Sequence, residues 1–293
     1  MIDDGVEVYR SFWRRDCDDR AFMLGAVGIA SVIVPRDDDF TLEVAAADVG
    51  RAASHLTQYE AENRPSPPPP PAPPLHPHAW AGCVGYAAWL LGVAYVISKG
   101  FVRLDAFDIG ELDAARVQSG QWWRAWTALT LHVSGPHLVA NLGAGIWFGY
   151  LAGRQLGVGV AWFLIVAAGG LANLVEGLFG PPWHQSVGAS TAVFAALGLM
   201  SAYTWHERLA LPQRWVQRWG PLVAGISLLG WLGTAGQHTD VMAHLLGFGI
   251  GVLLGAIAAL PAVRRRLHDV PQWPGGLAAV AIMVIAWGLA LAS

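Results

Sequence analysis

Charged residues are scarce in this sequence. Aspartate, glutamate, lysine and arginine make up 13% of its 293 residues, whereas hydrophobic residues make up 54%, and the mean hydropathy is +0.42. Ordinary soluble domains carry about 25% charged residues, so the chain is not expected to be wholly soluble. The formal net charge of −3 is not the basic excess of a nucleic-acid-binding protein, and no nucleic-acid partner is expected.

Cysteine is also scarce, since Cys17 and Cys83 are the two in the chain, which is too few for a disulfide framework. A secretory signal peptide is not expected, because the N-terminus MIDDGVEVYR is acidic and has no apolar core behind a basic start. His184 and His238 fall in predicted loops and are candidate metal ligands. The sequence contains no HExxH spacing, so we expect no zinc protease, and we predict no metal and no other cofactor.

Residues 1–63 are typical of a small soluble α+β module. Short β-branched runs predict strands and helical spacing predicts helices. The predicted order is β-α-β-β-α, over Val6–Arg10, Asp16–Val27, Ala30–Pro35, Phe40–Val44 and Ala46–Glu62. In the last helix we expect Val49, Ala52, Ala53 and Leu56 to face inward. No residue here suggests chemistry, so a module that binds an unknown partner, a regulatory module and a passive appendage all stay open.

The proline-rich stretch 64–78, RPSPPPPPAPPLHPH, follows this module. Proline runs favour the extended polyproline II conformation and cannot form the interior of a helix. We therefore predict a linker. A ligand for a proline-binding domain is the other use of such a composition.

Long apolar segments fill residues 79–293. We predict seven helices, over Trp80–Ser98, His137–Leu156, Val158–Leu178, Ser190–Trp205, Pro221–Ala235, Val241–Leu260 and Gly275–Ala292. Most approach the ~20 residues that cross the hydrocarbon core of a bilayer, and they lack the continuous polar face of a surface helix. The prediction is an all-α polytopic membrane domain. The short fourth and fifth segments suit helices that are buried among the others.

Arginine residues predict the orientation in the membrane. They follow the second, fourth and sixth segments, as Arg154, then Arg208, Arg214 and Arg218, then Arg264, Arg265 and Arg266. The opposite loops, 178–189 and 236–240, contain no lysine or arginine. The positive-inside rule then places the N-terminus in the cytoplasm and the C-terminus outside, in a plasma membrane of bacterial type. In the outer insertion 100–136, Gln121–Leu131 is too short to span and is expected to lie on or partly in the membrane.

Four polar side chains are predicted at a similar depth below the outer surface. Ser190 begins the fourth segment, His137 begins the second with Asn141 one turn later, and His244 lies one turn inside the sixth. Polar groups in membrane segments are costly and usually functional. A serine beside a neutral imidazole is an activatable nucleophile. The Asn141 amide, a His137 nitrogen and the Ser190 backbone N–H are donors for an oxyanion, so the set predicts acyl transfer.

Two simpler roles compete with this interpretation. Ser190 at a helix start is suited to be an N-cap, whose hydroxyl accepts a backbone N–H. Asp240 lies one turn before His244, so it is suited to orient the imidazole as in a triad or to cap its helix. The N-cap is the favoured role of Asp240.

These residues lie in motifs that resemble the rhomboid family of intramembrane serine proteases. The motifs are Trp123–Arg124, HVSGPHLVAN at His132–Asn141, GAS at Gly188–Ser190, and His244 followed by Gly247, Gly251 and Gly255. The resemblance covers about residues 80–260. It implies six core transmembrane helices with a seventh at about 275–292, a catalytic dyad of Ser190 and His244, and an oxyanion site at His137 and Asn141. It also implies that transmembrane proteins are cleaved as substrates within the lipid bilayer.

Three positions near the motifs carry further expectations. Thr191 stands where some family members have glycine, and its branched side chain is expected to narrow the surroundings of the nucleophile. Phe194 stands where some have tyrosine, so its ring is expected to stack on His244 without a hydroxyl contact. His132 is expected to tie the outer loop by hydrogen bonds. Two other functions compete with proteolysis. One is that of an inactive rhomboid-like protein that binds client transmembrane helices. The other is transport, which is less suited to polar residues that gather at a single depth.

Overall fold

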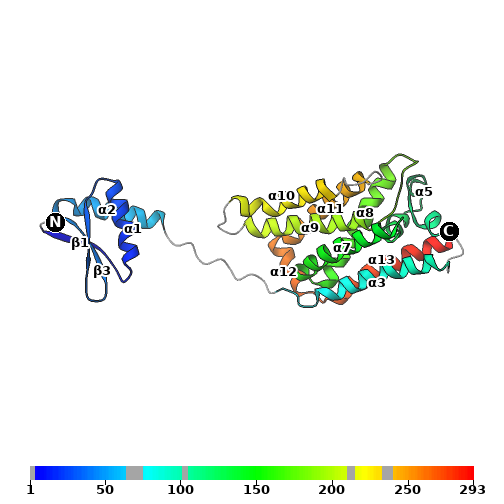
Figure 1. Cartoon of the computed structure of the whole chain (residues 1–293), viewed down its shortest axis with the longest axis horizontal. Coiled ribbons are helices and arrows are strands. Elements are labelled where there is room, and N and C mark those ends of the chain that lie inside the picture. Colours follow the sequence, from blue (N-terminus) through cyan, green and yellow to red (C-terminus); the bar gives the residue numbers. More distant parts are fainter. Residues whose placement is uncertain (1–3, 64–74, 101–104, 210–214, 233–239) are drawn as a thin grey trace. The chain divides into compact units, whose positions relative to one another are not determined.

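The computed structural model describes residues 4–63, 75–100, 105–209, 215–232 and 240–293. Most of the predicted linker, residues 64–74, and the candidate ligand His238 lie outside these ranges. The chain divides into two compact units, Met1–Pro71 and Ala72–Ser293. Both are drawn in Figure 1 and are described separately below.

The N-terminal unit is a three-stranded antiparallel sheet with two helices. Its elements are β1 (Gly5–Ser11), α1 (Arg14–Ala26), β2 (Ser31–Pro35), β3 (Phe40–Ala45), a short 3-10 turn (Ala46–Asp48) and α2 (Val49–Glu62). The strand order is β1-β3-β2, with Leu42 of the central strand paired with Tyr9 on one side and Ile33 on the other. Leu42 packs with Leu24, Ile29, Val44, Ala52 and Leu56 in the core.

One residue of α2 lies on a different face from the one predicted. Ala52 and Leu56 are buried, but Ala53 is exposed. A helix turns by about 100° per residue, and the face that meets the sheet is centred on residues 52 and 56. The next residue along the chain is therefore rotated towards solvent.

The second unit is a bundle of long helices. These are α3 (Ala79–Ser98), α7 (Gly135–Leu156), α8 (Val158–Phe179), α9 (Ser190–Leu209), α10 (Trp215–Leu232), α11 (Val241–Ala259) and α13 (Gln272–Ala292). Among the described residues, α3, α8, α11 and α13 are long and apolar enough to cross a membrane. Helix α9 is central, because it packs against α7, α8, α10 and α11 (Figure 1). The chain is an integral membrane protein.

The basic end of the bundle differs from the prediction. Helix α9 continues through Arg208 to Leu209, and residues 261–269, expected as a loop, form the short helix α12 (Pro261–Asp269). Proline is favoured in the first turn of a helix, which suits a start at Pro261. The Arg264 Nη1 atom lies 3.1 Å from Glu207 Oε1. This ion pair joins α12 to the last turns of α9, a contact between distant segments that periodicity does not reveal.

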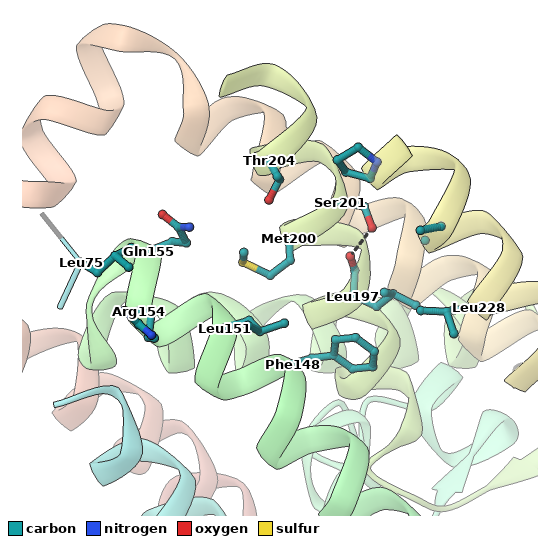
Figure 2. Close-up of a pocket in the computed structure, with 13 residues that line it drawn as sticks. Leu75, Phe148, Leu151, Arg154, Gln155, Leu197, Met200, Ser201, Thr204 and Leu228 are labelled. Carbon is teal, nitrogen blue, oxygen red and sulfur yellow. Dashed lines mark hydrogen bonds between the residues drawn. The ribbon is translucent and has the colours of Figure 1, made fainter. Parts of the chain in front are cut away.

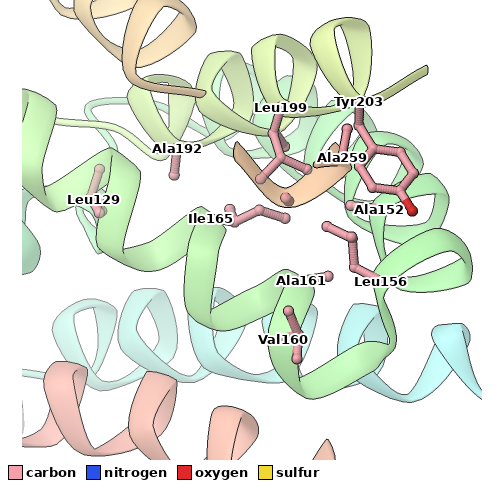
Figure 3. Close-up of a cluster of buried hydrophobic side chains, with 12 residues drawn as sticks. Leu129, Ala152, Leu156, Val160, Ala161, Ile165, Ala192, Leu199, Tyr203 and Ala259 are labelled. Atoms are coloured by element: carbon pink, nitrogen blue, oxygen red, sulfur yellow. The ribbon is translucent and has the colours of Figure 1, made fainter. Parts of the chain in front are cut away.

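The bundle core is built from small and branched side chains. Buried residues of α7, α8, α9 and α11 meet there, among them Ala152, Ile165, Leu199 and Ala259 (Figure 3). A single residue, Gly157, joins α7 to α8, and its φ of +86° favours glycine. The side-chain Oε1 of Gln272, at the start of α13, accepts the N–H groups of the first residues of α8, at 3.1 Å each. The α7–α8 turn is thereby fixed to α13.

Helices α9 and α11 share the most extensive contact among the described helices. A β-carbon added at Gly247, Gly251 or Gly255 would lie 2.4, 2.1 or 2.2 Å from a backbone carbonyl oxygen of α9. Real side chains do not approach that closely, so these positions need glycine. The small-residue stripe therefore brings the two backbones into direct contact.

Residues 105–134, between α3 and α7, are packed into the protein. They contain α4 (Ala106–Gly110), β4 (Leu112–Asp113), α5 (Ala114–Gln118), α6 (Arg124–Thr127) and a 3-10 turn (Ala128–Thr130). Helix α6 contacts α8 and α13. Arg124 is 1% exposed and donates to the Asp108 carbonyl at 2.8 Å, the Glu111 carbonyl at 3.0 Å and Gln121 Oε1 at 2.6 Å. These partners hold the guanidinium inside the fold, so Arg124 lies in the protein interior. The placement of residues 121–131 on or partly in the membrane stays a prediction.

Candidate active site

Ser190 and His244 are in direct contact. Ser190 is the first residue of α9, and His244 lies in the first turn of α11. The His244 Nε2 atom is 2.8 Å from Ser190 Oγ. His244 is 5% exposed, and the Phe194 ring centroid lies 4.4 Å from the imidazole centroid at an interplanar angle of 38°. The phenyl ring and the close α9–α11 packing hold the imidazole on the serine hydroxyl.

The GAS motif forms a tight backbone corner beside this pair. Gly188 has φ +136°, a conformation that favours glycine. A β-carbon there would lie 2.9 Å from His137 Nε2 and 3.7 Å from Asn141 Nδ2. Position 188 therefore needs glycine for two reasons: the positive φ angle, and the lack of room for a β-carbon. Because glycine has no side chain, two polar groups of α7 can approach the loop that leads to Ser190.

Asn141 presents a donor to the same region. The residue is 5% exposed, and its Nδ2 is buried without a hydrogen-bond partner among the described residues. Its backbone carbonyl accepts from the Tyr86 hydroxyl at 2.9 Å, which fixes this turn of α7 to α3. A cavity of about 630 Å³ is lined by Ser190, His244, His137 and Asn141. The four polar residues predicted at one depth thus share one cavity.

Residues 105–134, between α3 and α7, anchor the loop that leads to Ser190. The Gly188 N–H donates to the Ala128 carbonyl at 2.9 Å, and the Ala189 N–H donates to His132 Nε2 at 3.4 Å. Burial lowers the pKa of His132 to about 4, so the ring is neutral at physiological pH and its nitrogen can accept. Strand β4 also pairs with β5 (Gln185–Ser186). His132 thus contacts the loop that leads to Ser190.

The sequence of this region matches a known protein family. The model of the rhomboid domain matches residues 119–261, which include both members of the Ser190–His244 pair. The chain contains a rhomboid domain. It is also similar to rhomboid-like protease 3 of Toxoplasma gondii, with 27% identity over 168 residues. The match covers 56% of this chain and 60% of that relative, so the chain spans less than two thirds of the relative's length.

Two residues of this rhomboid depart from the family pattern, Phe194 and Thr191, and their side chains have different neighbours. Phe194 lines the cavity and stacks against His244, as described above. Thr191 is 2% exposed, and its γ-methyl lies 3.3 Å from the β-carbon position of Gly247. Its branched side chain therefore packs towards α11.

Asp240 caps the histidine helix. Its Oδ1 accepts the Ala243 N–H at 3.1 Å, as predicted for an N-cap. Its Oδ2 lies 3.1 Å from His184 Nε2. Burial alone would raise the pKa of Asp240, but His184 and the Ala243 N–H outweigh it and lower that pKa. In turn Asp240, and after it Glu176, raise the pKa of His184 to about 10.

Sequence reasoning did not single out Glu176, Tyr86 or Asn173. Glu176, 5% exposed, is the one charged residue in the apolar run Val158–Phe179, which was a usable signal. Asn173 donates from Nδ2 to the Ala125 carbonyl at 2.9 Å, and so holds α6 against α8. Such contacts join segments that are far apart in the sequence, and spacing alone does not predict them.

A second cavity lies further towards the arginine end of the bundle and shares Phe148 with the cavity at Ser190. It has a volume of about 330 Å³ and lies between α7, α9 and α10, with Arg154 and Gln155 among its lining residues (Figure 2). The Ser201 hydroxyl in its wall donates to the Leu197 carbonyl of its own helix at 2.8 Å. The Ser201 hydroxyl therefore bonds to a backbone carbonyl one turn earlier, as serine hydroxyls in helices commonly do, whereas the Ser190 hydroxyl contacts an imidazole.

Proposed function

We propose that this rhomboid is an intramembrane serine endopeptidase that cleaves client transmembrane segments near the outer membrane face. The observation that carries the proposal is the 2.8 Å contact between Ser190 Oγ and His244 Nε2. It lies in a cavity that also holds hydrogen-bond donors. The protease named among the relatives supports the same reaction class.

The first step is attack by Ser190. The His244 Nε2 atom accepts the hydroxyl proton while Oγ bonds to the carbonyl carbon of the scissile peptide. The carbonyl π electrons move to oxygen and leave a tetrahedral oxyanion. Burial of His244 beside Phe194 fixes the ring, so the proton acceptor is already aligned in the free enzyme.

Three donors are assigned to the oxyanion. They are the Asn141 amide, a His137 ring N–H and the Ser190 backbone N–H. The last lies at the start of α9, where the helix dipole favours negative charge. When the intermediate collapses, the C–N bond breaks and His244 returns its proton to the leaving amine. Water then repeats the sequence on the acyl-enzyme, releases the carboxylic acid and restores Ser190.

The substrate class follows from the location of the site. A peptide bond in a membrane helix is hydrogen-bonded within the helix, so a client must unwind locally before its carbonyl reaches Ser190. Small or helix-breaking residues near the cleavage site favour this unwinding. The cavity of about 630 Å³ has room for a short extended stretch of the client and for the hydrolytic water.

The orientation is proposed from the two ends of the bundle. Ser190 and His244 lie at the starts of α9 and α11, whereas Arg154 and Arg264 lie at the ends away from those starts. The positive-inside rule places the arginine end in the cytoplasm. We propose seven crossings in a plasma membrane of bacterial type, with residues 1–63 cytoplasmic, linked through 64–78, and the C-terminus outside. An unknown partner is a possible ligand of residues 1–63.

Cleavage of a model transmembrane substrate in proteoliposomes tests the reaction. Ser190→Ala and His244→Ala should each reduce turnover by about 10⁴-fold or more, because nucleophile and base act as a unit. Asn141→Ala should lose about 10²–10³-fold, since other donors remain. Ser201→Ala, the serine of the second cavity, is the matched control and should keep the wild-type rate.

Two outcomes would reject the proposal. Folded Ser190→Ala protein that still cleaves at the wild-type rate would exclude Ser190 as the nucleophile. Wild-type protein that binds the client helix but never cleaves it would favour the inactive, helix-binding alternative.

Cysteine labelling tests the orientation. In a background that lacks Cys17 and Cys83, Gln185→Cys should react with an impermeant reagent outside intact cells. Asp269→Cys, which is 82% exposed at its side chain, should react only after the membrane is opened. The reverse pattern would place the active site on the cytoplasmic side.

A further inference from the structure

Three potential metal ligands meet beside the start of α11. Glu176 lies in the last turn of α8, His184 lies in the following loop, and Asp240 caps α11. One ligand atom from each lies within 4.8 Å of the other two. Glu176 is 5% exposed, while the side chains of His184 and Asp240 are 23% and 19% exposed. The group is therefore buried, with a partial opening through which an ion can enter.

The distances within this cluster fit a small tetrahedral ion. The His184 Nε2 atom lies 3.1 Å from Asp240 Oδ2 and 3.5 Å from Glu176 Oε1. Zinc binds nitrogen and oxygen at about 2.0–2.2 Å, so neighbouring ligands in a tetrahedral site are about 3.3–3.5 Å apart. The two distances lie close to this spacing.

The close contacts in this cluster are not well-formed hydrogen bonds. Glu176 Oε2, His184 Nε2 and Asp240 Oδ2 are buried, and none meets the distance and angle requirements of a hydrogen bond among the described residues, although His184 Nε2 lies 3.1 Å from Asp240 Oδ2. His184 and Asp240 thus approach each other without hydrogen-bond alignment. Such an arrangement is expected when lone pairs point at a shared centre rather than at one another. Unsatisfied buried polar atoms are rare and costly, and a cation would satisfy all three residues together.

The ligand types indicate which ion fits this cluster. One imidazole nitrogen and two carboxylate oxygens form a ligand set that zinc accepts. An imidazole ligand favours zinc and its transition-metal neighbours over magnesium and calcium.

We propose that Glu176, His184 and Asp240 form a structural binding site for a divalent transition-metal ion, with Zn²⁺ as the preferred ion. The site takes no part in bond cleavage. It joins the end of α8 and the loop that leads to Ser190 to the cap of the helix that carries His244. The bound ion would therefore fix the positions of the nucleophile loop and the base helix relative to each other. The proposal stands whether or not the protein is a protease.

Metal content of the full-length protein tests the proposal. Detergent-purified protein is stripped with EDTA, equilibrated with Zn²⁺, dialysed and analysed by elemental mass spectrometry. We expect one bound Zn²⁺ per chain. Cobalt in place of zinc should give the intense visible absorption of tetrahedral Co²⁺, a readout that needs no variant. Ser190→Ala should bind the ion as wild type does, which separates this site from the proposed reaction.

Variants identify the ligands. Glu176→Gln, His184→Asn and Asp240→Asn should each weaken Zn²⁺ binding at least tenfold and abolish the rise in unfolding temperature that Zn²⁺ gives the wild type. Asparagine remains a good N-cap, so Asp240→Asn keeps the start of α11. His268→Asn is the matched control, because His268 lies 3.3 Å from a single carboxylate, Asp269, on an exposed helix. It should bind Zn²⁺ unchanged.

Wild-type protein without stoichiometric metal after this equilibration would overturn the proposal and leave a His184 ion pair in its place. Equal metal content in the wild type and all three ligand variants would also overturn it.

Discussion

Replacing Gly251 with alanine should separate the two helices that carry the candidate active site. The added β-carbon would lie 2.1 Å from the Ala195 carbonyl oxygen, about 1.3 Å short of the 3.4 Å at which ordinary contact begins. The obstacle is backbone, so no side-chain rotation relieves it. If α11 moves away by that amount, the 2.8 Å contact between Ser190 and His244 stretches towards 4 Å, beyond hydrogen-bond range.

The Gly251→Ala substitution should lower both the thermal unfolding midpoint and the rate of substrate turnover. Overpacking costs about 1–3 kcal/mol, and the better helix propensity of alanine returns up to about 1 kcal/mol. A net loss of up to about 3 kcal/mol should lower the thermal unfolding midpoint by up to several degrees. Loss of the aligned base should reduce turnover about 10²–10⁴-fold, measured on a transmembrane substrate in proteoliposomes.

Gly249 provides the matched control for this substitution. It lies two residues away on the same helix, and nothing lies within 4 Å of its β-carbon position. Gly249→Ala should keep both stability and rate. Folded Gly251→Ala protein with wild-type turnover would refute the claim that close α9–α11 contact aligns the pair.

Three further predictions concern the surroundings of the site. Arg124→Met should lower the unfolding free energy by about 3 kcal/mol, measured by denaturation in detergent, because buried carbonyls lose a charged donor; an unchanged value would contradict the anchoring role. Burial lowers the pKa of His132 to about 4, below its unfolded value of about 6.5, so its stabilising contribution is complete above pH 6.5 and is lost as the pH falls towards 4. A pH series of unfolding midpoints should show this slope flattened in His132→Asn, and an identical slope would contradict the assignment. Deleting residues 1–71, a separate compact unit, should leave substrate cleavage largely intact, and complete loss in a folded truncation would show that this unit takes part.

The sequence was most informative where a helix pattern and a chemical type coincide. Apolar runs located the long helices to within a few residues at most ends. Ser190, His137, Asn141 and His244 could be placed at one depth because each lies near the start of such a run. The structure brings them to one cavity, although their catalytic roles stay predictions.

What the sequence could not predict depends on contacts between distant segments. The burial of Arg124 could not be predicted, because its carbonyl partners follow no periodic pattern. Residues 261–269 were expected as a loop. The ion pair that holds this helix to α9 could not be foreseen, because Glu207 lies more than 50 residues from Arg264 in the sequence. Glu176 and Asp240 are separated by 64 positions in the sequence, and only the fold brings them to His184.

The central claim is that Ser190 is a nucleophile activated by His244. Reaction of the purified full-length protein with a serine-directed fluorophosphonate, followed by intact mass and peptide mapping, tests it most directly. The account predicts one adduct per chain, on Ser190, absent in Ser190→Ala and strongly slowed in His244→Ala. A folded wild-type protein that stays unlabelled, or labelling that persists in Ser190→Ala, would contradict it.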